Sequence, residues 1–142
     1  MKIKEIQEEL IDEFAMFDDW VERYEYMIDL GKSLPLIESE YKTDDYLVNG
    51  CQSKVWVNAE LIDNNIVFKA DSDAIISKGI IAILIRVFSH HKPNEIIEAS
   101  TDFIDKIGLK DHLSPNRANG LSSMIKQLKL YALAYQTKIN DE

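Results

Sequence analysis

The sequence predicts an α+β fold, in which a small antiparallel sheet of about three strands packs against helices. Three observations support this prediction. Apolar residues recur at helical spacing at both ends of the chain, they alternate with polar residues over two adjacent stretches in the middle, and Asp63-Asn64-Asn65 joins those two stretches. Because asparagine tolerates positive φ, this tripeptide is typical of a hairpin turn, and a hairpin makes the sheet antiparallel.

The first two elements are predicted to be amphipathic helices, because apolar side chains recur every three or four positions with acids and lysines between them. In the first helix these side chains are Ile3, Ile6, Leu10, Phe14 and Phe17. Asp18-Asp19 ends that helix, and Asp19 with Glu22 resembles a capping box for the second. The second helix is expected to have Gly31 as its C-cap, since Pro35 prevents it from continuing.

Residues 36 to 54 are polar and are expected to form a loop, with one possible short strand at Tyr46 to Val48. The first main strand follows, because alternate residues from Val55 to Leu61 are apolar and lie on one face. The return strand repeats the pattern in Ile66, Phe68 and Ala70.

The remaining elements are predicted to be helices. Asp71-Ser72-Asp73 is the expected cap of a helix over Ala74 to Phe88, which is apolar almost all round, as a buried central helix is. Two short helices are expected near Pro93 to Ser100 and Thr101 to Ile107, with Gly108 as the stop. Ser114-Pro115 gives the N-cap and first residue of a last helix. Its predicted inward side chains are Leu121, Met124, Ile125, Leu128, Ala132 and Tyr135.

Length and charge narrow the class of protein. With no repeat, low-complexity stretch or linker, residues 1–142 are expected to form one domain. The 16 basic against 25 acidic residues give a net charge of -9, which argues against nucleic-acid binding. The longest apolar run, Gly79 to Ile85, is too short to span a membrane, and the acidic N-terminal stretch does not fit a targeting segment. We therefore expect a cytoplasmic protein, either a monomer or a homodimer.

Cys51 is the single cysteine, which excludes a disulfide within the chain, a zinc site of four cysteines and a cluster held by cysteines. It lies in a loop before the first main strand, where a side chain can be presented to a partner. Gly50 leaves the sulfur open to approach and permits unusual backbone angles, and Lys54 is near enough in sequence to favour the thiolate. The alternative is an inert, buried cysteine.

The residues around Cys51 resemble a known family. The stretch Gly50-Cys51-Gln52-Ser53-Lys54-Val55-Trp56 is similar to the G-C-Q-S-x-V-W signature of the SufE family of sulfur-acceptor proteins. Three further blocks resemble that family in order and spacing: Trp20 to Pro35, Asp71-Ser72-Asp73-Ala74 with Lys78-Gly79, and His112 to Arg117 with Gly120-Leu121. Four ordered blocks make the resemblance much more specific than G-C-Q-S alone.

The resemblance implies a SufE/IscU-like fold and a role in sulfur transfer. A partner cysteine desulfurase of the SufS type, dependent on pyridoxal phosphate, would hold sulfur as a persulfide. Cys51 would attack that persulfide, carry the sulfur and pass it to a SUF scaffold complex of the SufBCD type for iron–sulfur cluster assembly, and the chain would stimulate the desulfurase. No cofactor is expected on this chain, because the pyridoxal phosphate belongs to the partner. Whether the chain is itself an enzyme stays open for the same reason.

Two alternatives stay open: a paralogous, CsdE-like acceptor that serves another desulfurase for tRNA or cofactor thiolation, and a non-catalytic adaptor with an inert cysteine. An IscU-type scaffold is disfavoured, because a cluster needs about three to four soft ligands and this chain has one cysteine. A single cysteine suits a carrier, since a nearby second thiol would displace the bound sulfur as sulfide.

Further site residues follow from the resemblance. The residues expected to support the Cys51 loop or to bind a partner are Gly50, Gln52, Ser53, Asp73 and Arg117. For Asp73 the alternative is a helix cap, and for Arg117 a solvated side chain.

Three other predictions concern side chains near the expected site. An apolar pocket is expected to shelter the sulfur, with Leu47, Val48 and Trp56 as its candidates. His112 is a weaker candidate for a base acting on Cys51. His90-His91 is expected to form a fraying helix end rather than a metal site.

Overall fold

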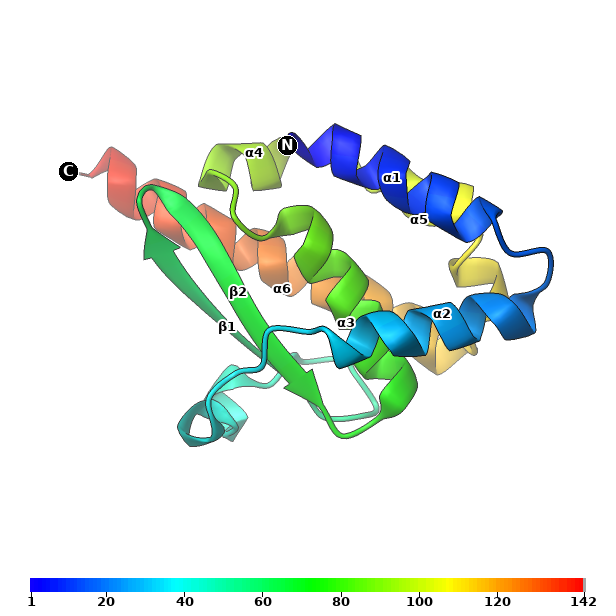
Figure 1. Ribbon diagram of the computed structural model, residues 1–142. Helices are drawn as coiled ribbons and strands as arrows, with labels where there is room; N and C mark the ends of the chain where they lie inside the picture. The colour runs from blue at the N-terminus through cyan, green and yellow to red at the C-terminus, as the bar shows by residue number, and fades with distance from the viewer. Residues whose placement is uncertain (142) are drawn as a thin grey trace.

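The computed structural model describes residues 1–141, and Figure 1 shows helices packed around a long antiparallel hairpin. The helices are α1 (Ile3–Ala15), α2 (Trp20–Lys32), α3 (Ile75–Phe88), α4 (Pro93–Glu98), α5 (Asp102–Ile107) and α6 (Pro115–Asn140). The strands are β1 (Val55–Ile62) and β2 (Asn65–Ser72), and three short 3₁₀ turns are η1 (Ser39–Tyr41), η2 (Asp44–Tyr46) and η3 (Lys110–His112). The predicted α+β class is confirmed.

The hairpin has the predicted turn but fewer strands than expected. Asp63 and Asn64 both have positive φ and join β1 to β2 in a two-residue turn. In residues 1–141 the sheet has two strands, so the expectation of about three was wrong. Residues 44 to 46 form η2 instead of a third strand, and Leu47 makes only an isolated bridge to Trp56. The positive φ of Gly50 then turns the chain before a longer ladder forms.

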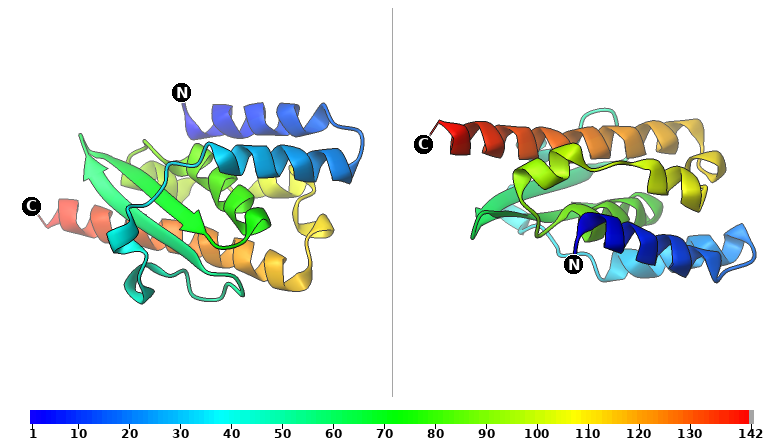
Figure 2. Two further views of the ribbon diagram at one scale, coloured as in Figure 1. Left: turned by 60° about the horizontal axis from the view of Figure 1, so that its bottom comes forward. Right: turned by 90° about the horizontal axis from the view of Figure 1, so that it is seen from above.

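The central position of α3 follows from its sequence, in which apolar residues occupy nearly every position. Ten of its residues are buried, among them Ile80, Ile83 and Phe88. Figure 2 shows, from above, α3 between α6 on one side and α1 and α2 on the other. The prediction of a buried central helix is confirmed.

Two glycines allow α2 to approach α3 closely. A Cβ added to Gly31 would lie 3.1 Å from the backbone N of Gly79, and one added to Gly79 would lie 2.6 Å from the backbone O of Met27. Gly31 is therefore inside α2, which continues to Lys32, and its predicted role as a C-cap was wrong. The glycine is needed for the contact between two helices rather than for the end of one.

The other predicted helix ends are mostly confirmed. Asp19 accepts a hydrogen bond from the backbone N–H of Glu22, Gly108 adopts the left-handed conformation after α5, and Ser114 caps α6. The expected cap of α3 was wrong, because Ala74 occupies the N-cap position without a side-chain hydrogen bond. Asp73 uses its carboxylate elsewhere, as described below.

Candidate functional site

Cys51 lies in a tight turn between the bridge at Leu47 and the start of β1. Gly50 has φ +93°, a conformation that favours glycine, and a Cβ at this position would collide with the Ser123 hydroxyl on α6. Val48 anchors the turn, because its backbone N–H donates to the Val55 carbonyl over 2.8 Å. These constraints place the sulfur against the N-terminal part of α6.

The Cys51 thiol is half-buried, and its Sγ lies 3.6 Å from the Gly120 carbonyl, to which it can donate a hydrogen bond. Burial raises the pKa of Cys51 above its ordinary value of 9.0. The expectation that Lys54 favours the thiolate was wrong, because Lys54 is exposed and burial is what shifts the pKa of the thiol. In the described conformation the sulfur is therefore held as a thiol.

A small cavity of about 210 Å³ opens beside the sulfur. Its lining residues are Cys51, Gln52 and Ser53 of the loop, Ser77 of α3, and Ser114, Asn116, Arg117, Gly120 and Met124 of the α6 end. The expected apolar pocket of Leu47, Val48 and Trp56 was wrong, since none of these residues lines the cavity. The turn at Gly50 directs Cys51 toward the polar N-terminal end of α6, whereas Val48 is buried in the core.

Residues from two distant blocks of the sequence meet at this cavity. The Asn116 amide Nδ2 donates to Gln52 Oε1 over 3.1 Å, which joins the loop directly to α6. Arg117 is the charged side chain among the lining residues, and its backbone N–H donates to the cap residue Ser114. Of the predicted site residues, the structure brings Gln52, Ser53 and Arg117 together around Cys51.

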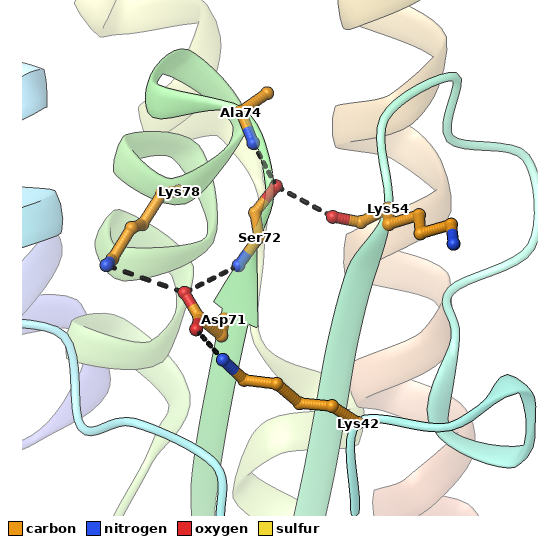
Figure 3. Close-up of polar contacts among 6 residues, drawn as sticks. All are labelled: Lys42, Lys54, Asp71, Ser72, Ala74 and Lys78. Carbon is orange, nitrogen blue, oxygen red and sulfur yellow. Dashed lines mark hydrogen bonds and ion pairs between the residues drawn. The ribbon is translucent and has the colours of Figure 1, made fainter. Parts of the chain in front are cut away.

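Asp73 lies at the other end of the Cys51 loop. Its carboxylate accepts a hydrogen bond from the Lys54 backbone N–H over 3.0 Å, and its own backbone N–H donates to the Lys54 carbonyl over 3.2 Å. The Ser72 hydroxyl donates to the same Lys54 carbonyl, as Figure 3 shows. Asp73 thus binds the loop where it joins β1, rather than capping α3.

Sequence reasoning missed two ion pairs at this junction, which share one carboxylate. Asp71 forms ion pairs with Lys42 of the loop and with Lys78 of α3 (Figure 3), and its side chain is only 11% exposed. Alternation along β2 places Asp71 on the same face as Val67 and Lys69, so the strand pattern gives no sign of burial. Asp71 is buried because distant lysines cover it, which no local pattern predicts.

The histidines do not lie where the sequence suggested. His112 is not among the residues that line the cavity, and its ring stacks on Trp20 with 3.9 Å between the ring centroids. His91 is buried, and its ring nitrogens lie 2.9 Å from the Ser89 carbonyl and 3.0 Å from the Met1 carbonyl, so the expectation of a fraying helix end was wrong.

Residues 1–141 have neither a cluster of metal-ligating side chains nor a membrane-spanning helix. They contain no group of three or more His, Cys, Asp or Glu side chains arranged to hold a metal ion. None of the helices they form is long and apolar enough to cross a membrane.

Comparison with known proteins gives consistent matches. The family model described as "SufE: Fe-S metabolism associated domain" matches residues 8–132. An uncharacterised SufE-like protein of Rhizobium meliloti is 41% identical over 127 residues, with 86% of this chain and 91% of that protein covered. An uncharacterised SufE-like protein of Synechocystis is 36% identical over 127 residues, with 89% and 80% covered.

Two more matches extend the comparison. The SufE-like protein 1 of Arabidopsis thaliana, described as chloroplastic/mitochondrial, is 36% identical over 132 residues, which are 92% of this chain but 36% of that longer protein. The solution structure of a hypothetical protein from Thermus thermophilus has a TM-score of 0.77 at 16% identity, with 93% of this chain and 96% of that chain covered. At this identity, the structural match establishes a shared fold.

Proposed function

Because this chain belongs to the SufE family, we propose that it accepts sulfur from a cysteine desulfurase onto Cys51 and carries it as a persulfide for iron–sulfur cluster assembly. The observation that carries the proposal is the position of Cys51, which lies in the family signature and beside a small polar cavity. That cavity offers space for one additional sulfur atom on Sγ.

The transfer step is an exchange between sulfur atoms. The Cys51 thiolate attacks the outer sulfur of the desulfurase persulfide, a new S–S bond forms to Cys51, and the bond from that sulfur to the desulfurase cysteine breaks. The desulfurase cysteine leaves as a thiolate and takes up a proton. The step needs no external oxidant or reductant. The partner desulfurase would hold pyridoxal phosphate, which would supply the chemistry that takes sulfur from free cysteine.

The cavity supports this role through hydrogen bonding rather than through an apolar shelter. A persulfide anion would find the Arg117 guanidinium and the hydroxyls of Ser53 and Ser77 among the lining groups. Charge-assisted hydrogen bonds from such groups would favour an anion on the added outer sulfur, whereas burial raises the pKa of Cys51 itself. They also limit the directions from which a reductant reaches it.

We propose a SufS-like desulfurase as the donor, a SUF scaffold complex as the next acceptor, and the cytoplasm as the setting. The acidic net charge of -9 suits a partner with basic residues at its docking surface. These assignments rest on family membership and on the charge of the chain.

The test is intact-protein mass spectrometry under non-reducing conditions, after incubation with a SufS-type desulfurase and free cysteine. We expect one added sulfur atom on Cys51, removed by a thiol reductant, and no addition when free cysteine is omitted. The Cys51→Ser variant should still bind the desulfurase but take up no sulfur and give no stimulation. Unchanged stimulation by Cys51→Ser would instead identify the chain as an adaptor with an inert cysteine.

A further inference from the structure

The segment that carries Cys51 is attached at both ends to one tripeptide at the end of β2. At its entry, Lys42 forms an ion pair with Asp71. At its exit, the Lys54 backbone is bound by Ser72 and Asp73. Figure 3 shows the Lys42–Asp71 ion pair and the Ser72–Lys54 hydrogen bond side by side at the end of the hairpin. We call the residues from Lys42 to Lys54 the thiol segment.

The exit attachment includes a backbone hydrogen bond of the hairpin, whereas the entry attachment is an ion pair between side chains. Lys54 directly precedes β1, and the hydrogen bond from the Asp73 backbone N–H to its carbonyl extends the ladder between β1 and β2. The Asp73 carboxylate and the Ser72 hydroxyl add two side-chain hydrogen bonds to the Lys54 backbone. Lys42 instead lies in the loop between η1 and η2. Its ammonium group lies 5.7 Å from the centre of the Trp56 ring and reaches Asp71, which is the residue opposite Trp56 in the ladder.

Asp71 is suited to hold this cation. Its Oδ1 accepts a hydrogen bond from the Ser72 backbone N–H over 2.8 Å and lies 3.4 Å from the Lys78 ammonium, and this leaves Oδ2 for Lys42. The carboxylate is mostly buried, so its attraction for Lys42 is less screened than that of an exposed pair. Burial acts to raise the pKa of Asp71, but the hydrogen bonds from Lys42 and Ser72, together with the charges of Lys78 and Lys42, lower it below its ordinary value.

We propose that Asp71 is a positioning residue for the sulfur-carrying thiol, because its ion pair with Lys42 holds the entry of the thiol segment on the hairpin and thereby limits the exposure of Cys51. The role in sulfur transfer rests on the function proposed above, whereas the anchoring itself does not. Between the two attachments, the Val48 backbone N–H donates to the Val55 carbonyl, and the segment contacts α6 through Cys51 Sγ and Gln52. Release of its entry leaves the Val48 hydrogen bond and the two contacts with α6 to keep the sulfur at the cavity.

The two lysines on Asp71 provide a matched pair of variants. Lys42→Met removes the ion pair that reaches the thiol segment, and Lys78→Met removes the ion pair to the same carboxylate from α3. We expect iodoacetamide to modify Cys51 about tenfold faster in Lys42→Met than in the wild type, which corresponds to about 1.4 kcal/mol in the local opening equilibrium. Lys78→Met should react at the wild-type rate. Lys42→Arg retains the cation and should also react at the wild-type rate.

Urea unfolding separates this effect from general destabilisation. If a less stable fold were the cause, Lys78→Met would react faster in proportion to its loss of stability. Equal reaction rates in Lys42→Met and Lys78→Met would overturn the proposal. Asp71→Asn provides a second variant, because its amide still accepts the Ser72 hydrogen bond but loses both ion pairs, and it should react as fast as Lys42→Met.

The sulfur-transfer part of the inference has its own measurement. After loading by the desulfurase, Lys42→Met should lose its added sulfur to dithiothreitol faster than Lys78→Met does. If the wild-type chain takes up no sulfur while Lys42→Met still reacts faster with iodoacetamide, the proposed function fails and the anchoring stands. If the wild type takes up sulfur and the two variants do not differ in either measurement, the role of Asp71 fails and the proposed function stands.

Discussion

The Cys51 thiol is both the proposed carrier of sulfur and a group whose surroundings favour the protonated form. Its Sγ is within hydrogen-bonding distance of the Gly120 carbonyl, and a thiol can donate to that carbonyl whereas a thiolate cannot. Burial acts in the same direction. A carrier held in this way has little tendency to react with the many small electrophiles of a cell before it meets a persulfide donor.

This environment predicts the pH dependence of Cys51 alkylation. Because burial raises the pKa of the thiol, the iodoacetamide rate of the folded chain should still increase with pH at its ordinary value of 9.0. The urea-unfolded chain, in which the sulfur is solvated, should give a rate profile with its midpoint near that ordinary value. A folded-state midpoint below that of the unfolded chain would show that the site stabilises the thiolate instead.

At the scale of the elements, the glycines at the contact between α2 and α3 determine how closely these two helices pack. Gly31 and Gly79 face each other, and the added Cβ at Gly79 would lie 2.8 Å from the Met27 side chain as well as 2.6 Å from its carbonyl. The neighbouring backbone of α2 cannot move aside without shifting the whole helix. Lys78, one of the two partners of Asp71, directly precedes Gly79, so this packing also positions the junction behind the thiol segment.

The Gly79→Ala variant should therefore be destabilised by about 1–3 kcal/mol in urea unfolding, as expected for an overpacked core. Gly31→Ala is the matched control, because its added Cβ meets backbone atoms only at 3.1 to 3.4 Å. The higher helix propensity of alanine, worth about 1 kcal/mol, offsets part of that tighter contact. Equal loss of stability in the two variants would mean that the helices adjust to either Cβ.

The elements that the sequence predicted well are those that depend on a few consecutive residues. The turn at Asp63-Asn64, the stop at Gly108 and the cap at Ser114 were all expected, because each reflects the conformational preference or the hydrogen bonding of one or two residues. The cap role expected for Gly31 and the cap alternative for Asp73 were wrong for the opposite reason. Each resembles a local signal for a helix end, but each has its actual partner in another element.

Across the whole molecule, the site could be predicted only in part. The signature identified Cys51 and Gln52, but their surroundings come from α6, and the contacts join residues 69 and 64 positions apart. The same holds for Asp71 and Lys42, which approach only after the hairpin has formed. Family motifs identify individual residues of the site, whereas the polar character of the cavity arises from packing between distant segments.

One further set of interactions joins α1, α2 and α3. Arg86 of α3 donates to Glu13 of α1 over 2.8 Å, and Tyr26 of α2 donates to the same carboxylate. The hydrogen bond from Arg86 is the main reason why the pKa of Glu13 lies below its ordinary value of 4.5. Glu13 therefore links the acid stability of the fold to the attachment of α1.

The sign of that dependence follows from the lowered pKa. Since the unfolded chain binds a proton at Glu13 more readily than the folded chain does, the contribution of Glu13 to stability is fully present above pH 4.5 and is lost as the pH falls through the lower, folded-state pKa. Glu13→Gln should reduce the free energy of unfolding at about pH 7, and its difference from the wild type should shrink as the pH falls below 4.5. Urea unfolding at several pH values measures both effects. Arg86→Met should reduce the same pH dependence, and the Tyr26 hydrogen bond to Glu13 should keep the remainder. A difference between wild type and Glu13→Gln that stays constant through this range would rule out the link.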